Sequence, residues 1–228
     1  KWVVKALRQA LVTHGRSGEE LEALLAADNA DPEVALCARP GLIAPEALAK
    51  AARKADRAHD VEPRPGRISP LAVVMVGGDP GRIEAIRDCR AGVEDEGSQL
   101  VALVAAHAPV EGRDERWLDL CAGPGGKAAL LAARAAQKSA HLLANEVSPH
   151  RADLVSSALR AVPQDVARVR CGDGRDLGRE EPGGYDRVLV DAPCTGLGSL
   201  RRRPEARWRR RPEDVTVLAE LQRELLAS

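Results

Sequence analysis

Short, largely apolar runs alternate with amphipathic segments through the second half of the chain. The runs have the length and composition of buried strands, and they lie at 117–120, 141–144, 166–169 and 186–190. Helical periodicity separates them, at 128–136 and at 149–159, where Ser148 and Pro149 form a helix-start signal. This alternation predicts an α/β fold with a parallel sheet and right-handed crossovers.

The first half of the chain predicts a smaller α+β module. Gly15 ends the first expected helix, Ser17 with Glu20 forms a capping box, and Pro45 occupies a first-turn position. Helices are expected at 2–14, 17–25 and 46–55, and strands at 34–38 and 71–76. The stretch 59–70 contains three prolines and a glycine, so we expect it to be irregular.

The boundary between the two parts is expected near Cys89. The small module then covers residues 1–88, and the α/β domain covers 89–228. Residues 90–99 are interpreted as a linker that leads into a helix at 98–106.

A glycine-rich turn joins the first strand of the α/β domain to its first helix. The sequence of residues 119–127 is Asp-Leu-Cys-Ala-Gly-Pro-Gly-Gly-Lys. Glycines allow close approach of a ligand to the backbone, and the following helix start offers unpaired N–H donors. The turn therefore indicates a nucleotide-type cradle, and the alternative is a plain strand-to-helix turn. Asp119 within the strand must bond local N–H groups or a ligand.

Acidic residues follow the other strands at or just past their ends. Glu146 lies about twenty residues beyond the glycines, where a carboxylate commonly binds ribose hydroxyls. Asp173 and Asp191 follow the next two strands. Ligands of open α/β sheets bind at the carboxyl ends of the strands, so we expect these acids and Gly123 to line one crevice.

Asp191, Pro193 and Cys194 combine an acid and a thiol at the same expected edge. One use for such a pair is pyrimidine chemistry. A thiolate that adds to C6 of cytosine makes C5 nucleophilic toward a sulfonium methyl group, and an acid beside N3 supports the charge shift. The alternative for Cys194 is a small packed residue.

Composition narrows the class of protein. The formal net charge is zero, so no global basic field announces a nucleic-acid partner. The five cysteines form no Cys-x-x-Cys pair, which disfavours a zinc site or a disulfide framework and fits reduced thiols in a cytoplasmic protein. No apolar run approaches transmembrane length, and no signal peptide is visible.

One short stretch after the Pro-Cys turn is strongly basic. Residues 201–211 contain seven arginines, together with Trp208 as a stacking surface. Arginine contacts phosphates and stacks on bases, so the stretch favours RNA binding. The alternative is a solvated charged loop.

Residues 119–127 and the sequence Asp-Ala-Pro-Cys-Thr-Gly-Leu-Gly at 191–198 resemble motifs I and IV of the S-adenosylmethionine-dependent RNA cytosine-C5 methyltransferases. The RsmB/Sun/Fmu-like branch, which acts on small-subunit rRNA, is the most similar. Asp-Glu-Gly-Ser-Gln at 95–99 and Arg-Arg-Arg-Pro-Glu-Ala-Arg-Trp at 201–208 also resemble that branch. Residues 1–70 match more loosely, as an RNA-binding module.

The resemblance implies a Rossmann-like class I methyltransferase sheet and S-adenosylmethionine as cofactor. Glu146 is implied on the ribose, Asp173 near the adenine, and Asp191 between cofactor and cytosine, with Cys194 assisting proton removal. The cofactor-binding set is Cys121, Ala122, Gly123, Pro124, Gly125, Gly126, Lys127, Glu146, Asp173 and Asp191, and the RNA-binding set is Arg201, Arg202, Arg203, Arg207 and Trp208. No metal or membrane is implied, and the full-length protein is expected to be a monomer.

One departure from the family pattern affects activity. The attacking cysteine of the family lies in a Thr-Cys-Ser motif, and this sequence has none. We therefore expect the chain to be C-terminally truncated and inactive alone, with an incomplete sheet whose strand at 186–190 forms an open apolar edge. Cys194 replaces the missing thiol only if the protein follows the DNA cytosine methyltransferase arrangement. The alternatives are an NAD-dependent oxidoreductase, which leaves Asp-Ala-Pro-Cys unexplained, and a non-catalytic RNA-binding fragment.

Overall fold

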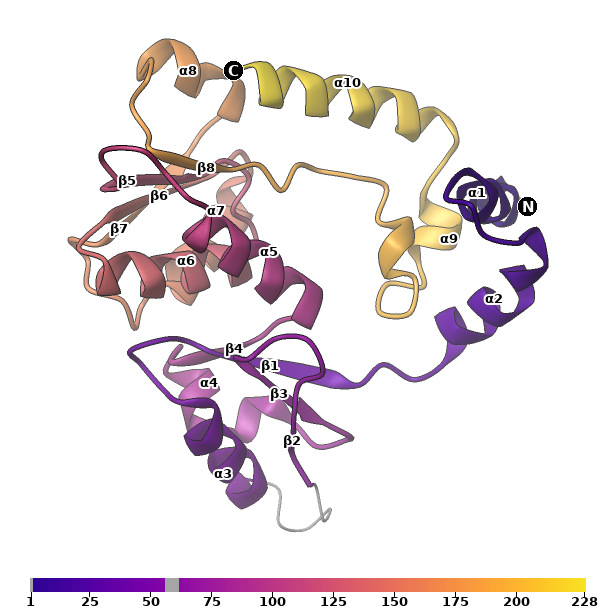
Figure 1. The fold of residues 1–228 in the computed structure, drawn as a ribbon, viewed down its shortest axis with the longest axis horizontal. Helices are drawn as coiled ribbons and strands as arrows, with labels where there is room; N and C mark the ends of the chain where they lie inside the picture. Colours follow the sequence, from indigo (N-terminus) through magenta and orange to yellow (C-terminus); the bar gives the residue numbers. More distant parts are fainter. Residues whose placement is uncertain (1, 56–61) are drawn as a thin grey trace. The chain divides into compact units, whose positions relative to one another are not determined.

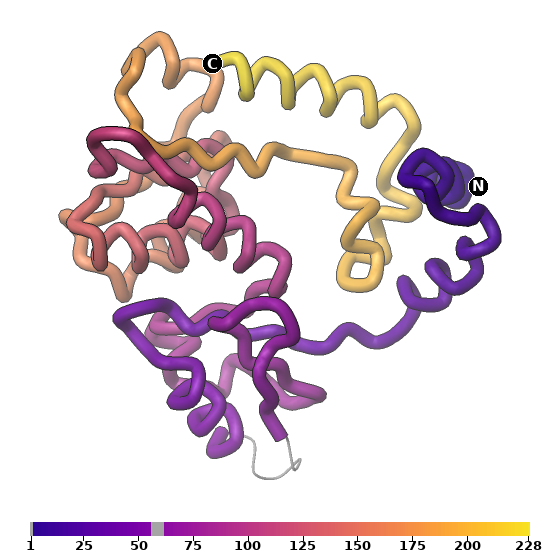
Figure 2. Tube along the Cα trace, in the orientation of Figure 1, coloured from indigo at the N-terminus to yellow at the C-terminus, as the bar shows by residue number. Residues whose placement is uncertain are grey.

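The computed structural model describes residues 2–55 and 62–228 (Figure 1). The chain forms two compact units. The larger unit consists of residues 33–192 and 225–228, and the other consists of residues 1–32 and 193–224. Figure 2 follows the path of the backbone through both. Within the described part of the chain, no helix combines the length and apolar character needed to cross a lipid bilayer.

The larger unit begins with a small antiparallel sheet. Its strand order is β2-β3-β1-β4, formed by Arg64–Pro65, Ala72–Met75, Val34–Ala38 and Ala91–Val93. Buried aliphatic residues from these strands pack with α3 (Pro45–Ala55) and α4 (Glu84–Arg87), which a short helix η3 (Pro80–Arg82) precedes. Leu36, Leu48 and Met75 are fully buried in this core. An aliphatic core suits a chain that contains no phenylalanine.

A four-stranded parallel sheet follows, with strand order β7-β6-β5-β8. Its strands are β5 (Arg116–Asp119), β6 (His141–Glu146), β7 (Ala167–Cys171) and β8 (Arg187–Leu189). Leu118 of β5 pairs in register with Leu143 of β6 and with Val188 of β8. All neighbouring pairs are parallel, so the carboxyl ends of the four strands lie along one edge of the sheet.

One face of the parallel sheet is covered by α5 (Glu96–His107), α6 (Gly126–Gln137) and α7 (Pro149–Ala158). Alanines along α6 allow close packing, and Leu130 and Val155 are fully buried between the helices and the sheet. Trp117 is the largest buried side chain of this core, and its Nε1 donates to Asp114 Oδ1 at 2.8 Å. Asp114 also pairs with Arg187, and these bonds lower the pKa of Asp114 to about 2.

The other unit is helical. It contains α1 (Trp2–Thr13), η1 (Gly18–Glu20), α2 (Leu21–Asn29), η5 (Leu197–Ser199), α9 (Ala206–Arg209) and most of α10 (Glu213–Ala227). Val3, Leu200 and Ala206 form its buried centre. Trp2 joins the two chain segments of this unit, because its Nε1 donates to the carbonyl oxygen of Arg210 at 3.0 Å.

The α/β fold and its parallel sheet are confirmed, as are the capping box at Ser17 and the helix that begins at Pro45. Three details differ from expectation. Strand β2 lies within the stretch 59–70 that was expected to be irregular, of which residues 59–61 lie outside the described residues. The side chain of Ser148 makes no capping hydrogen bond. Strand β4 lies within the expected linker, beyond the boundary placed at Cys89, so the small sheet extends to Val93.

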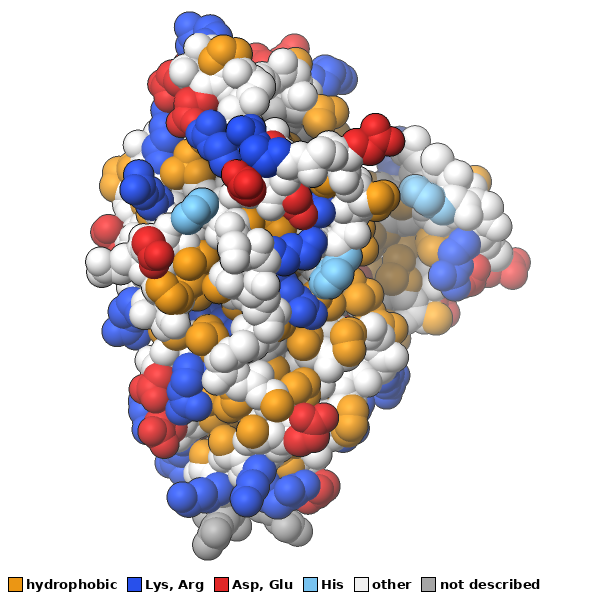
Figure 3. All heavy atoms as spheres, turned by 60° about the vertical axis from the view of Figure 1, so that its left-hand side comes forward, with side chains coloured by type: hydrophobic (Ala, Val, Ile, Leu, Met, Phe, Trp, Pro, Cys, Tyr) orange, Lys and Arg blue, Asp and Glu red, His pale blue; other side chains and the backbone are white. Residues whose placement is uncertain are grey.

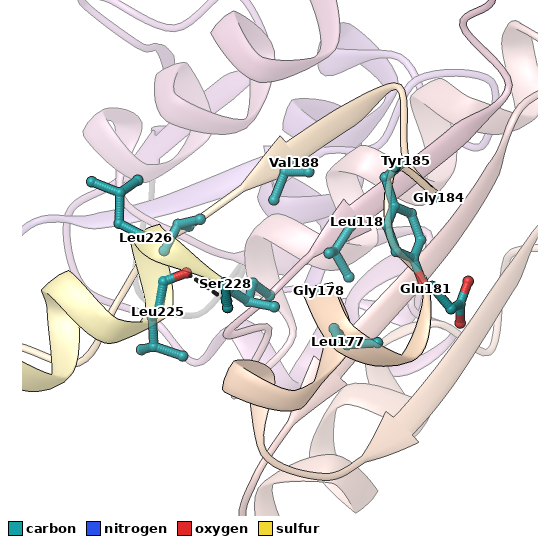
Figure 4. Close-up of a pocket in the computed structure, with 13 residues that line it drawn as sticks. Leu118, Leu177, Gly178, Glu181, Gly184, Tyr185, Val188, Leu225, Leu226 and Ser228 are labelled. Carbon is teal, nitrogen blue, oxygen red and sulfur yellow. Dashed lines mark hydrogen bonds between the residues drawn. The ribbon is translucent and has the colours of Figure 1, made fainter.

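The second face of the parallel sheet carries an apolar cavity of about 320 Å³. Figure 4 shows that its lining includes Leu118 and Val188 of the sheet, Leu177 of α8 (Leu177–Glu180) and Leu225 from the end of α10. In the described residues β8 pairs only with β5, and its residue Val188 is 52% exposed. On this face Leu118 of the interior strand β5 is 4% exposed, so the open apolar surface lies along the edge strand β8.

We expect that open surface to drive self-association, and Val188→Lys to reduce it. A lysine on an edge strand opposes pairing with a second chain because its charge must remain hydrated. Sedimentation velocity over a concentration series measures the effect. Val217→Lys is the matched control, because Val217 is a 64% exposed residue of α10. Equal association of both variants and the wild type would contradict the prediction.

Candidate cofactor-binding site

The turn between β5 and α6 requires its glycines. Gly125 has φ +110°, in the left-handed region that favours glycine. A Cβ at Gly123 would collide with Oε2 of Glu146. A Cβ at Gly125 would lie 2.8 Å from the Cβ of Ala158. The backbone of this turn therefore lies close to the end of β6 and to the end of α7, with no room for side chains. A ligand can approach such a backbone closely.

Glu146 holds this turn in place from the end of β6. The residue is only 2% exposed, and its Oε2 accepts a hydrogen bond from the N–H of Gly123 at 3.0 Å. Its Oε1 accepts from the N–H of Ser148 at 3.0 Å. Arg151 pairs with the same carboxylate at 3.5 Å and also donates to the carbonyl oxygen of Gly123. Hydrogen bonds and an ion pair thus compensate the burial of this charge.

Asp119 at the end of β5 has a contrasting environment. The residue is 1% exposed, and neither carboxyl oxygen has a hydrogen-bond partner. Burial raises the pKa of Asp119 to about 7, against the weaker opposing effects of the Cys121 backbone and the charge of Lys127. The sequence predicts either local N–H groups or a ligand as the partner of Asp119. The local contribution, from the Cys121 backbone, is weak, which leaves a ligand as the remaining partner.

Lys127, in the first turn of α6, connects two further elements to the cradle. Its Nζ lies 2.8 Å from Oδ2 of Asp191, which follows β8. Its Nζ also donates to Oγ of Ser98 on α5 at 3.2 Å. The Asp191 side chain is 51% exposed, so it is open to a ligand while the lysine holds it.

Glu94 is a member of this site that sequence reasoning missed, because residues 90–99 were interpreted as a linker. It directly follows β4 and is 8% exposed, with no partner for its Oε1. A Cβ at Gly126 would lie 3.2 Å from that oxygen, so the carboxyl group contacts the first residue of α6. Burial raises the pKa of Glu94 to about 7, although the positive charge of Lys127 opposes the shift. No motif marks this position.

Asp173 lies at the predicted edge but is bound to its own loop. It caps the short helix η4 (Gly174–Asp176), where its Oδ1 accepts from the N–H of Arg175 at 3.0 Å. The Arg175 side chain forms an ion pair with it at 2.6 Å, and these bonds lower the pKa of Asp173 to about 2. Its position near an adenine stays a prediction.

The structure therefore brings Gly123 and Glu146 into contact, and likewise Lys127 and Asp191, at the carboxyl ends of adjacent strands. Cys121 lies in the same turn, and burial raises the pKa of its thiol to about 11. All five cysteines are free thiols. Among the residues that the structure describes, no group of three or more His, Cys, Asp or Glu side chains is arranged to hold a metal ion.

Cys194 and the arginine stretch belong to the helical unit. Cys194 is exposed. Arg201 donates to the carbonyl oxygens of Ala30 and Asp31, and Arg207 donates to that of Asp28, so both bind the end of α2. Trp208 is 70% exposed. Sequence reasoning did not foresee that part of the basic stretch has this structural task.

The charges of the molecule are mixed rather than gathered by sign. Figure 3 shows Lys and Arg side chains interspersed with Asp and Glu side chains on the face drawn. This agrees with a formal net charge of zero. A local basic segment, not a global field, is therefore the feature of this chain that suits a nucleic acid.

The chain has a Rossmann-like class I methyltransferase fold, in which the glycine turn lies at the carboxyl edge of the parallel sheet. The family model described as 16S rRNA methyltransferase RsmB/F matches residues 105–228. The chain belongs to this family of methyltransferases, whose methyl donor is S-adenosylmethionine. This assignment sets aside the nicotinamide-dependent oxidoreductase.

Individual relatives agree with the family assignment. A putative methyltransferase of Mycobacterium tuberculosis (strain CDC 1551 / Oshkosh) is 53% identical over 228 residues, which are 100% of this chain and 46% of that protein. The probable ribosomal RNA small subunit methyltransferase B of Bacillus subtilis (strain 168) is 31% identical over 182 residues, which are 76% of this chain and 40% of that protein. The chain thus spans less than half the length of these two relatives.

A solved structure shares the fold. The crystal structure of NSun6 from Pyrococcus horikoshii with SFG superposes with a TM-score of 0.76 at 16% identity. The similarity covers 98% of this chain and 78% of that one.

We expect Asp119→Asn to stabilise the ligand-free chain more at pH 8 than at pH 5. Unfolded Asp119 ionises near its ordinary pKa, whereas the folded group, with a pKa of about 7, resists ionisation. Folding stability is therefore lost as the pH rises toward 7, and asparagine removes that loss. The stabilisation should grow by on the order of 2 kcal/mol between the two pH values.

Urea unfolding at both pH values measures this effect. Asp153→Asn, at an exposed acid of α7, is the matched control and should show no comparable dependence. A stabilisation by Asp119→Asn that is independent of pH would contradict the assigned ionisation.

Proposed function

We propose that this chain is the cofactor-binding part of an RNA methyltransferase that methylates C5 of a cytosine in small-subunit ribosomal RNA, in the cytoplasm. The observation that carries the proposal is the glycine turn held by Glu146 beside the Lys127–Asp191 pair. The names of the relatives, which specify small-subunit ribosomal RNA, support the substrate. The RNA cytosine-C5 specificity rests on the motif resemblance.

The residues of the cradle suit S-adenosylmethionine. Side chains are excluded at Gly123 and Gly125, and the start of α6 presents N–H donors that suit a carboxylate. We assign residues 121–127 to the amino-acid part of the cofactor, Glu146 to the ribose and Asp173 to the adenine. When bound, the cofactor supplies an electrophilic methyl group on a sulfonium centre.

The chemistry of the target base assigns tasks to the next residues. C5 of cytosine becomes nucleophilic when a thiolate adds at C6 and an acid supports the charge at N3. Asp191 is proposed as the group beside N3, because Lys127 holds it at 2.8 Å and it is half exposed. Cys194 is proposed to assist removal of the C5 proton. No Thr-Cys-Ser sequence occurs among the 228 residues, so the thiol that adds to C6 is not assigned here.

We expect this chain to bind S-adenosylmethionine but not to turn over. A version extended at its C-terminus by the remaining sequence of the mycobacterial relative should methylate small-subunit ribosomal RNA at C5 of cytosine. Transfer of a radiolabelled methyl group to RNA measures turnover, and nucleoside analysis identifies the methylated base and atom. NAD serves as the negative control in calorimetric binding to the chain.

Two results would contradict the proposed function. Label on another base or another atom would remove the cytosine-C5 assignment. Failure of the extended version to label RNA while it binds the cofactor would favour a non-catalytic RNA-binding protein.

The basic stretch at residues 201–211 is proposed to guide RNA. Arg201, Arg202, Arg203, Arg207 and Trp208 form the segment, and phosphate contacts with stacking are the chemistry it offers. Arg201 and Arg207 also hold α2, so reversing their charge would disturb the helical unit. Exposed Arg203 and Arg209 give a cleaner test.

We expect the double variant Arg203→Glu, Arg209→Glu to weaken RNA binding by about tenfold or more at low salt. Each lost phosphate contact also lowers the salt dependence of the binding constant. Fluorescence anisotropy with a single-stranded ribosomal RNA fragment at several salt concentrations measures both. Arg179→Glu, on α8, is the control for an exposed charge reversal. An unchanged affinity and salt slope would show that the stretch is only a solvated loop.

A further inference from the structure

Two buried carboxyl groups beside the cradle have oxygens without hydrogen-bond partners. Asp119 is 1% exposed and both of its carboxyl oxygens have no hydrogen-bond partner. Glu94 is 8% exposed and its Oε1 has none. Such groups are costly to bury unless something compensates them. Glu146, at the end of the neighbouring strand β6, is by contrast bound to two N–H donors and paired with Arg151.

The cations near these two acids are already committed. Lys127 lies in the field of both, but its Nζ pairs with Asp191 and donates to Ser98. Arg39 also acts on Glu94, but its Nη1 donates to the carbonyl oxygens of Cys89 and Ala158. One lysine is therefore shared among three acids, which leaves this corner of the cradle able to accept a further positive group.

The start of α6, beside these two acids, offers groups that bind an anion. Gly126 is the first residue of α6, and the Glu94 carboxyl group packs against it. The first N–H groups of a helix have no partner within the helix and attract an anion. Acids with unpartnered oxygens beside the start of a helix match an α-amino acid, which carries an ammonium and a carboxylate on one carbon atom.

We propose that Glu94 is a cofactor-binding residue, and that Glu94 and Asp119 together receive the α-ammonium group of S-adenosylmethionine while the start of α6 receives its carboxylate. This inference rests on the proposed function, because it assumes this cofactor. It adds a residue that directly follows the small antiparallel sheet to a site otherwise built at the edge of the parallel sheet. The acids discriminate ligands by the presence of an amino-acid group rather than by the nucleoside.

Calorimetric binding of two ligands to the whole 228-residue chain tests this assignment. S-Adenosylhomocysteine carries the α-ammonium and the carboxylate, whereas 5′-methylthioadenosine keeps the nucleoside and the thioether but lacks the amino-acid group. We expect Glu94→Gln to weaken S-adenosylhomocysteine about tenfold, which corresponds to about 1.4 kcal/mol, and to leave 5′-methylthioadenosine unchanged. Glutamine keeps the volume of the side chain and removes its charge.

Glu84→Gln, at an exposed acid of α4, is the matched control and should bind both ligands as the wild type does. Thermal unfolding of each variant verifies that it is folded. If Glu94→Gln binds S-adenosylhomocysteine as the wild type does, or loses both ligands equally, the assignment of Glu94 is wrong while the proposed function stands. If the wild type binds neither ligand, the proposed cofactor site itself fails, and this inference fails with it.

Discussion

The arrangement of the site depends on one hydrogen-bonded carboxylate, that of Glu146. Its position at the end of β6 follows from the parallel register, which aligns the ends of adjacent strands. From there it accepts the N–H of Gly123 and fixes the path of the glycine turn before α6 begins. Because any side chain at Gly123 would collide with that carboxylate, the glycine and the acid require each other.

A contrast between carboxyl groups distinguishes scaffold from binding surface. Glu146 is buried with its partners in place, so the free-energy cost of burying its charge is compensated within the chain itself. Asp119 and Glu94 are buried with unpaired oxygens, and burial raises the pKa of each to about 7. Acids with perturbed pKa values beside a ligand cradle are typical of functional sites, because evolution there retains groups that a stable core would exclude.

The parts of the fold that local sequence signals determine were predictable. Strand and helix alternation predicted the parallel sheet, and the glycines predicted the turn before α6. Strand β4 was not predictable, because three residues that include a glycine carry no periodic signal and become a strand only by pairing with β1. Glu94 was missed for the same reason. The contacts of Arg201 with the end of α2 depend on residues about 170 positions apart, which no local pattern encodes.

Stability and binding are opposed at the cradle. Unpaired acids weaken the ligand-free chain, and a ligand that brings a cation to them returns that free energy as affinity and as stabilisation of the folded state. Lys127 limits the conflict, because its charge opposes the pKa shifts of both acids while it pairs with Asp191. A second lysine or arginine in place of a ligand would stabilise the empty chain further but would also occupy the position of the incoming cation. Under the proposed assignment of Glu94 and Asp119, the incomplete charge balance is a requirement of binding rather than a defect of the core.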